Sequence, residues 1–352
     1  MIDKENWRLT KKYLEYRLRV NQITLGSLKK EQTHLRYVLN WAQECYFRQV
    51  MILRPTFPEY LLSERLDGEE GQLSAVYLKK KLASARYFFS WLSDNEPGFK
   101  AIKNSWIETL KLKRLSEVPK TREAVSLEEV QAIAKSPVCT ISERRARAAL
   151  VFLFLSGMRI GAFVSLPLKA VDLSSRKVIQ YPSLGVRTKN SKYAITYLLD
   201  IPELMKVVQE WDDEIRAILP PSGYWFAPLS PETGQIDLNV VSVGEHRSTL
   251  ARRSMKEFLD TVSLLYHSPH KFRHGFIQYG AANSKTVADF KAVSMNVMHA
   301  SMEITDEFYS NLNDGELENR IGSLNKQGIN LEDSELRLFR QFLEWKKKLG
   351  SS

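Results

Sequence analysis

The sequence predicts a mainly α-helical protein with one small antiparallel β-sheet, divided into two domains. The chain has 352 residues, enough for two domains that each bury a core. Apolar residues recur at helical spacing over long stretches on both sides of a basic connector that contains Pro119. Short runs rich in β-forming residues lie between positions 177 and 199, which indicates a hairpin or a small sheet within the second domain.

The first domain, residues 1–115, is expected to be helical. Apolar stripes predict helices over residues 27–50 and 72–93, and a third helix over 99–115. Lys79 and Arg86 share one flank of the second helix, with Lys80 beside them. Such a basic flank can lie along phosphates while the apolar stripe packs on a core, although a solvated basic face explains it about as well.

A basic linker, residues 116–125, is expected to join the domains. The cations that lead into it and cross it are candidates for contacting a polyanion backbone: Lys111, Lys113, Arg114, Lys120 and Arg122. The second domain is expected over residues 126–320. Ser126 with Glu129, and Thr140 with Glu143, have the spacing of capping boxes, so a helix should begin at each pair.

The helix that starts at Thr140 contains the longest apolar run, Ala148–Met158, and should end near Gly157. This run is too short to span a bilayer and indicates a buried core helix. Runs at 177–181 and 193–199 predict two strands, with Lys189 near the turn between them and Arg187 and Lys192 on the same basic loop.

Helices are expected next over residues 203–219 and roughly 244–266. Ser268-Pro269 should start another helix, which places His270 in its first turn, and Gly280 is a plausible stop. Residues 321–352 form a separate tail, with an amphipathic helix over 334–348 whose apolar side needs a partner surface.

Charge indicates a polyanionic partner. The net charge is +10 and the isoelectric point is about 9.4. Residues 1–120 carry 22 lysines and arginines against 14 acidic residues, and the remainder carries 29 against 27. The first domain should therefore supply much of the grip on the polyanion. A generic basic soluble protein would also account for the net charge.

Several classes of protein are disfavoured. Cys45 and Cys139 are isolated, which argues against a disulfide scaffold or a zinc site and fits a reducing cytosol. The polar, charged N-terminus is not a signal peptide. No phosphate-binding glycine loop and no carboxylate cluster at metal spacing is present, so we expect no metal, no cofactor and no membrane partner.

Six residues suit chemistry on a phosphodiester. Arg159 and Arg273 can offer forked donors to its oxygens, and His270 can accept the proton of an attacking hydroxyl. Lys189 can donate a proton to a leaving oxygen, with Lys192 and Arg187 as competitors for that role. Tyr309 can attack as a nucleophile, and His299 can hydrogen-bond the phosphate.

Each of these residues also has an ordinary explanation. Arg159 could simply complement the end of a buried helix, and Lys189 could be a solvated loop lysine. His270 and His299 could be polar residues of helix starts, and Tyr309 is one of 14 tyrosines. His274 fits a buried supporting residue better than a reactive one.

Five short motifs follow one another in the sequence: SGMRIGAF, RTKNSKY, HKFRHGF, VMHASM and DEFYSNL. Their residues and order resemble the active-site motifs of the tyrosine recombinases, the family of phage integrases and Xer-type enzymes. The resemblance covers most of the chain and maps the family's catalytic positions onto Arg159, Lys189, His270, Arg273, His299 and Tyr309. Two departures stand out. Ala162 replaces an acidic residue usual in the family, and the interval from His299 to Tyr309 is one residue longer than usual.

The resemblance implies a helical core-binding domain and a mixed α/β catalytic domain that close as a clamp around double-stranded DNA. It implies strand cleavage and rejoining through a 3′-phosphotyrosyl intermediate without a cofactor, in a tetramer on DNA, and it allows for accessory DNA-bending proteins. The tail helix resembles segments that dock onto the next protomer. The expected location is the cytoplasm, at the nucleoid of a prokaryotic or viral host. A type IB topoisomerase and a catalytically inactive DNA-binding protein remain alternatives.

Overall fold

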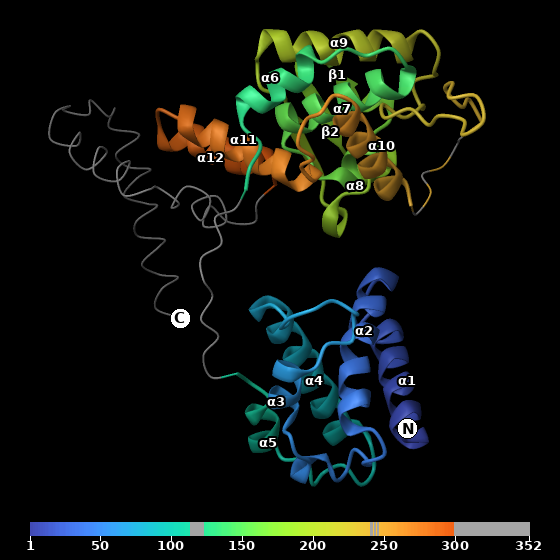
Figure 1. The fold of residues 1–352 in the computed structure, drawn as a ribbon, viewed down its shortest axis with the longest axis vertical. Coiled ribbons are helices and arrows are strands. Elements are labelled where there is room, and N and C mark those ends of the chain that lie inside the picture. Colours follow the sequence, from blue (N-terminus) through green and yellow to red (C-terminus); the bar gives the residue numbers. More distant parts are fainter. Residues whose placement is uncertain (113–122, 240–241, 243, 245, 299–352) are drawn as a thin grey trace, which may run out of the picture. The chain divides into compact units, whose positions relative to one another are not determined.

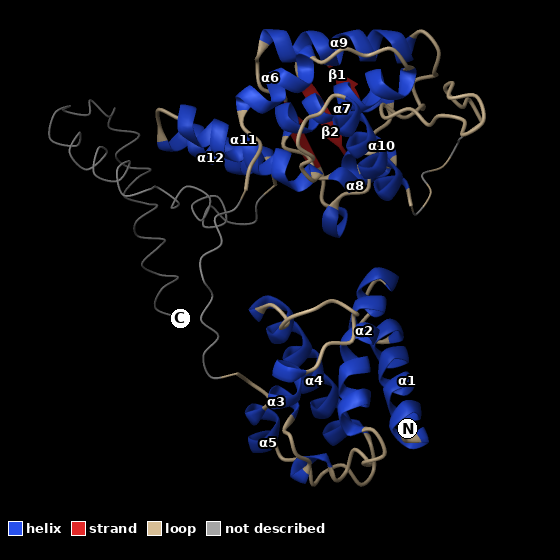
Figure 2. Cartoon of the chain, viewed as in Figure 1, coloured by secondary structure: helices blue, strands red, loops and turns tan. Residues whose placement is uncertain are grey.

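The computed structural model describes residues 1–112, 123–239, 242, 244 and 246–298. The chain separates into two compact units, residues 1–120 and 121–352, each with its own hydrophobic core. In the described residues the units are mainly helical, with one three-stranded antiparallel sheet in the second unit (Figures 1 and 2). The predicted fold class, mainly α with a small antiparallel sheet, is confirmed.

The first unit consists of helices joined by turns. Its helices are α1 (Lys4–Arg19), α2 (Leu25–Ala42), α3 (Phe57–Ser63), α4 (Ala75–Asn95) and α5 (Asn104–Thr109), with a 3₁₀ turn at Val50–Ile52. Helices α1, α2 and α4 pack on one another around an aromatic core in which Phe47, Phe88 and Phe89 are fully buried. The apolar stripe predicted over residues 72–93 lies on α4 and faces this core.

Two predicted helices of this unit are too long. The expected helix over 27–50 ends at Ala42, because Gln43 adopts a positive φ of 46° and turns the chain. The side-chain amide of Asn6 donates to the Cys45 carbonyl at 2.8 Å and accepts from the Phe47 amide at 2.9 Å. These two bonds replace the main-chain hydrogen bonds that a continued helix would provide. The expected helix over 99–115 is only α5, and its predicted end lies outside the described residues.

The second unit is built around α7. Its helices are α6 (Leu127–Lys135), α7 (Ile141–Ser156), α8 (Ile160–Phe163), α9 (Pro202–Arg216), α10 (Arg247–Thr261), α11 (Pro269–Asn283) and α12 (Val287–Asn296). Every residue of α7 from Ala148 to Ser156 is buried, and the helix contacts α6, α9, α10 and α11 (Figure 1). The prediction of a buried core helix that ends at Gly157 is confirmed.

The capping boxes form as predicted. The Ser126 hydroxyl accepts from the Glu129 amide at 3.2 Å while the Glu129 carboxylate accepts from the Ser126 amide at 2.7 Å. Thr140 and Glu143 repeat this arrangement at the start of α7. These reciprocal bonds satisfy helix amides that have no partner within the helix, which is why so local a pattern predicts a helix start reliably.

The sheet has the order β1-β2-β3 and is antiparallel throughout. Strands β2 (Lys177–Gln180) and β3 (Ala194–Tyr197) are the predicted hairpin, with Val178 opposite Thr196. The short β1 (Val171–Asp172) was not predicted from the sequence. Three 3₁₀ turns, Leu168–Ala170, Pro182–Leu184 and Lys189–Ser191, flank or lie within the connections of this sheet.

Helix α11 corrects the role predicted for Gly280. The helix starts at the expected Ser268-Pro269, but it continues through Gly280 to Asn283. A Cβ atom at Gly280 would lie 2.7 Å from Cγ2 of Val293, so glycine is needed here to let α12 approach. Helices α1, α3 and α12 were not predicted, and the expected helices over 203–219 and 244–266 are shorter, as α9 and α10.

The Gly280→Ala substitution should destabilise the second unit by about 1–3 kcal/mol, because the added methyl group overpacks the contact between α11 and α12. Urea unfolding followed by circular dichroism measures the effect. Gln278→Ala, an exposed change on the same helix, is the control and should stay within about 0.5 kcal/mol of wild type. Equal effects of the two substitutions would contradict the packing role of Gly280.

Candidate active site

Arg159 follows a turn that only glycine allows. Helix α7 ends at Gly157 in the left-handed conformation, with φ of 61°, and a Cβ atom there would lie 2.8 Å from both Phe276 and Val297. After this turn Met158 is buried and Arg159 takes the N-cap position of α8. Partial burial lowers the pKa of Arg159 from its ordinary value.

Arg273 lies beneath this turn. Its side chain is 2% exposed, with Nη1 donating to the Gly157 carbonyl at 2.8 Å and Nη2 donating to the Val297 carbonyl. Burial, and then the charge of nearby Arg159, lowers the pKa of Arg273 to about 9. Within the described residues no carboxylate pairs with this guanidinium, so the two arginines form a local excess of positive charge.

His270 and Arg159 line the same hollow, which has a volume of about 250 Å³. The remaining lining residues are Met158, Ile160, Arg252, Ser268 and Pro269. His270 is exposed in the first turn of α11, as predicted, and its ring centroid lies 4.4 Å from that of His274. The structure therefore brings together the first arginine and the HKFRH motif, which lie more than a hundred residues apart in the sequence.

Arg252 at this hollow was not predicted. It is exposed on α10, one residue before Arg253, and the sequence gives no signal that separates the two. Only the packing of α10 against α7 directs one of them to the hollow. Arg252 adds a third arginine to the cations around the candidate site.

The basic loop between β2 and β3 is fastened at its base and exposed at its tip. Val186 is buried, and the Arg187 amide donates to the Ser165 hydroxyl at 2.8 Å. Lys189 begins a turn in which Asn190 and Ser191 have positive φ values, and it is exposed near the hairpin turn as predicted. It does not line the hollow of Arg159.

The two competitors of Lys189 have different surroundings. Nη1 of Arg187 donates to the Gly244 carbonyl at 3.2 Å, so this guanidinium helps to anchor the loop. Lys192 lines a different hollow, of about 510 Å³, among Tyr193, Tyr197 and residues at the end of α12. None of the three cations is among the described residues that line the hollow of Arg159.

The last described residues lie against Arg273. Asn296 at the end of α12 bonds to the backbone of β3, with its side chain accepting from the Tyr197 amide at 2.7 Å and donating to the Tyr197 carbonyl at 3.0 Å. This fixes Val297, whose carbonyl Arg273 binds. His299 and Tyr309 lie outside the described residues, as does the segment 334–348 predicted to be a tail helix; the described chain ends at Met298.

Ala162, the position of the missing acidic residue, is buried in the hydrophobic core of the second unit. A carboxylate in that apolar setting would need a partner to remain charged. The described residues include no carboxylate that takes its place beside Arg273. The departure from the family pattern is therefore accommodated by apolar packing.

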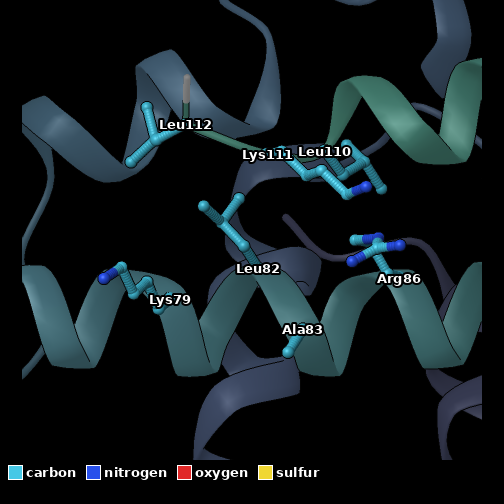
Figure 3. Close-up of a pocket in the computed structure, with 7 residues that line it drawn as sticks. All are labelled: Lys79, Leu82, Ala83, Arg86, Leu110, Lys111 and Leu112. Atoms are coloured by element: carbon cyan, nitrogen blue, oxygen red, sulfur yellow. The ribbon is translucent and has the colours of Figure 1, made fainter. Parts of the chain in front are cut away.

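Three of the candidate cations of the first unit line one hollow of about 280 Å³. Lys79, Arg86 and Lys111 surround the apolar residues Leu82, Ala83, Leu110 and Leu112 (Figure 3). Lys80 is exposed on α4, with Nζ 6.0 Å from the ring centroid of Tyr77. The remaining candidates of the connector, Lys113, Arg114, Lys120 and Arg122, lie outside the described residues.

The described part of the chain offers no metal centre, since it contains no group of three or more His, Cys, Asp or Glu side chains placed to hold an ion. None of the described helices is long and apolar enough to cross a membrane.

A sequence model described as the phage integrase family matches residues 123–316, more than half of the chain. No curated protein matches the chain. Several solved structures resemble it at low identity, which concerns the fold alone. The Tn1549 transposon integrase in complex with transposon right end DNA is 16% identical, with a TM-score of 0.56, and the match covers 92% of this chain and 100% of that chain.

Two further solved structures show the same likeness. The XerH site-specific recombinase bound to its difH substrate is 15% identical with a TM-score of 0.56, covering 89% of this chain and 83% of that chain. A lambda integrase fragment, solved as a dimer bound to a COC′ core site, is 15% identical with a TM-score of 0.52, covering 84% of this chain and 96% of that chain.

The affinity of this site for an oxyanion should fall as the pH rises through about 9, because Arg273 is cationic below its lowered pKa and neutral above it. Sulfate is a suitable probe, since its own charge does not change in this range. The Cζ resonance of Arg273, followed by NMR with and without sulfate, measures both the proton loss and the binding. Arg273→Gln identifies the resonance, and a resonance that does not titrate below pH 11 would contradict the lowered pKa.

Proposed function

We propose that this chain, which belongs to the phage integrase family of tyrosine recombinases, is a site-specific enzyme that cleaves and rejoins double-stranded DNA through a 3′-phosphotyrosyl intermediate. One observation carries the proposal. The buried guanidinium of Arg273 lies near Arg159 without a carboxylate partner among the described residues, and Arg159 lines a hollow together with His270. Two such charges near one hollow suit a phosphodiester, whose transition state gains negative charge on its oxygens.

Each residue has a defined part in the proposed reaction. The Tyr309 hydroxyl attacks the phosphorus and gives its proton to His270, forming a phosphotyrosyl bond as the bond to the 5′ oxygen breaks. Lys189, on the exposed loop tip, donates a proton to that oxygen, which leaves as a 5′ hydroxyl. The 5′ hydroxyl of a partner strand then attacks the phosphotyrosine and returns the phenol. The phosphotyrosyl bond retains the energy of the broken phosphodiester, so rejoining requires no ATP.

The cations act at different ranges. Arg159 offers its donors at the edge of the hollow, where an entering phosphate can meet them. Arg273 is buried, and its charge acts on the phosphate through surroundings of low dielectric, where electrostatic interactions are stronger than in water. Arg252 contributes a further phosphate contact from α10. His299 hydrogen-bonds the phosphate and completes the pocket.

The two units divide the work on DNA. In this proposal residues 1–115 bind DNA, the linker 116–125 crosses the DNA backbone, and residues 126–320 carry out catalysis. The solved relatives bound to transposon ends, a difH substrate and a core site support double-stranded DNA as the partner. A tetramer on DNA, in which the tail 321–352 docks on a neighbouring protomer, completes the proposal, and such an enzyme would act at the nucleoid in the cytoplasm of its host.

A suicide duplex with a nick beside the cleavage position tests the chemistry. A binding site selected from random DNA supplies the sequence. Wild type should become covalently joined to DNA, and Tyr309→Phe should not, because it lacks the attacking oxygen; denaturing gel electrophoresis detects the adduct. Tyr193→Phe, which removes an exposed hydroxyl from the same unit, should keep it.

The outcomes separate the alternatives. DNA binding without an adduct in the wild type would identify a catalytically inactive DNA-binding protein. An adduct that survives Tyr309→Phe would assign the nucleophile to another residue. Relaxation of a supercoiled circle without exchange between paired sites would identify a topoisomerase.

Arg252→Ala should slow adduct formation by about tenfold to a hundredfold, because a charge-assisted bond to phosphate is worth on the order of 1.5–3 kcal/mol. Arg253→Ala is the matched control. It removes the same charge from the next residue of α10, but Arg253 does not line the hollow and lies 3.7 Å from Glu257. Single-turnover rates on the suicide duplex measure both, and equal rates would remove Arg252 from the site.

A further inference from the structure

An acidic side chain occupies the place where the first unit is expected to meet DNA. Oε1 of Glu108 accepts from Nη2 of Arg86 at 2.5 Å, and its Oε2 accepts from Nζ of Lys111. Both cations are candidate DNA contacts, and Figure 3 shows them lining one hollow between α4 and the end of α5. All three side chains are between one third and one half exposed, so the cluster is open to solvent.

The ion pair between Arg86 and Glu108 engages only one nitrogen of the guanidinium. Glu108 engages Nη2, while Nε of Arg86 is buried and has no hydrogen-bond partner within the described residues. A guanidinium binds an anion best when two neighbouring N–H groups donate in parallel. The two unesterified oxygens of a phosphodiester can accept such a pair of bonds, whereas Glu108 accepts only one from Arg86. Because Nε is buried, the pair forms only when the Arg86 side chain turns toward the phosphate.

The surroundings favour an anion of that size. The hollow of about 280 Å³ has a floor of leucines and alanine, which lowers the local dielectric and strengthens interactions with charges at its rim. A second hollow of about 180 Å³ shares Ala83 and Arg86 with the first and is also lined by Glu108. Arg86 therefore lines both hollows, and its partner Glu108 lines the second.

We propose that Arg86 and Lys111 form a binding site for a DNA backbone phosphate, and that the carboxylate of Glu108 occupies this site in the free protein and competes with the phosphate. The inference rests on the proposed function. A phosphate that enters must displace the carboxylate or tolerate its like charge. Glu108 thus weakens binding to any duplex, and stable binding depends on contacts elsewhere, which is a form of discrimination by a repulsive element.

Neutralising Glu108 tests this competition. A duplex of arbitrary sequence, about 30 base pairs long, is used at about 50 mM salt, because non-specific binding is electrostatic and independent of sequence. The full chain with Glu108→Gln should bind this duplex about fivefold more tightly than wild type, the value of an exposed ion pair of about 1 kcal/mol. Fluorescence anisotropy of labelled DNA gives the affinities.

Glu15→Gln is the matched control. Glu15 is exposed on α1 of the same unit and pairs with Arg19 at 2.8 Å, so its loss changes the net charge equally without touching the hollow. It should leave the affinity within about twofold of wild type. A double variant, Arg86→Gln with Glu108→Gln, should lose the gain, because the competitor acts through Arg86.

Several outcomes would overturn the proposal. An affinity of Glu108→Gln equal to wild type, equal to Glu15→Gln, or weaker than wild type would overturn the proposal and leave Glu108 as a structural link between α4 and α5. A gain that persists without Arg86 would also overturn it. Failure of the wild type to bind any duplex at low salt would instead overturn the proposed function on which the inference rests.

Discussion

The geometry of the candidate site depends on the hydrogen bonds of one buried guanidinium. Arg273 joins the carbonyl of Gly157, at the end of the core helix α7, to the carbonyl of Val297, just after α12. These two points are far apart in the sequence, and α11 supplies the residue that holds them together. A buried charge without a carboxylate partner costs free energy, since desolvation opposes it. A residue kept under such conditions, beside a second arginine, fits a role in binding an anion better than a role in stability.

The geometry around this arginine is held from several sides. Gly157 lets the chain turn within reach of Phe276 and Val297, and Asn296 fastens the end of α12 to the edge of β3. The site is therefore positioned by regular elements and not by long loops, as precise anion binding requires. The first unit differs, because its described candidate cations lie on the exposed surface of α4 and just after α5, and one acidic residue already engages two of them. In the second unit the charge of Arg273 is buried and fixed in position. In the first unit Arg86 and Lys111 would have to release Glu108 before they bind a phosphate.

Local signals in the sequence predicted the parts of the fold that local hydrogen bonds determine. Ser126 and Thr140 each start a helix where expected, because each cap and its partner lie three residues apart. Ser268 also starts a helix where expected, without a side-chain cap bond but with proline at the first helical position. The helix over 27–50 was predicted too long because its apolar stripe continues to Tyr46, while the turn at Gln43 depends on Asn6, about forty residues away. Arg252 could not be told from Arg253 for the same kind of reason: the packing of α10 decides which of them reaches the hollow. The HxxR spacing and the arginine after the core helix could be selected from the sequence because their order and residue types form a recognisable pattern, which does not depend on knowing how the helices pack.

The loop between β2 and β3 combines a fixed base with an exposed tip. Val186 and the bond from the Arg187 amide to Ser165 fasten the base to α8, and strand pairing holds both ends, whereas residues 189–192 contribute nothing buried. The scaffold therefore tolerates changes of sequence and length at the tip at little thermodynamic cost. Related enzymes could diverge in this segment while the core stays the same. An engineer could exchange the residues of the tip around Lys189, altering how the protein meets its substrate without refolding the scaffold.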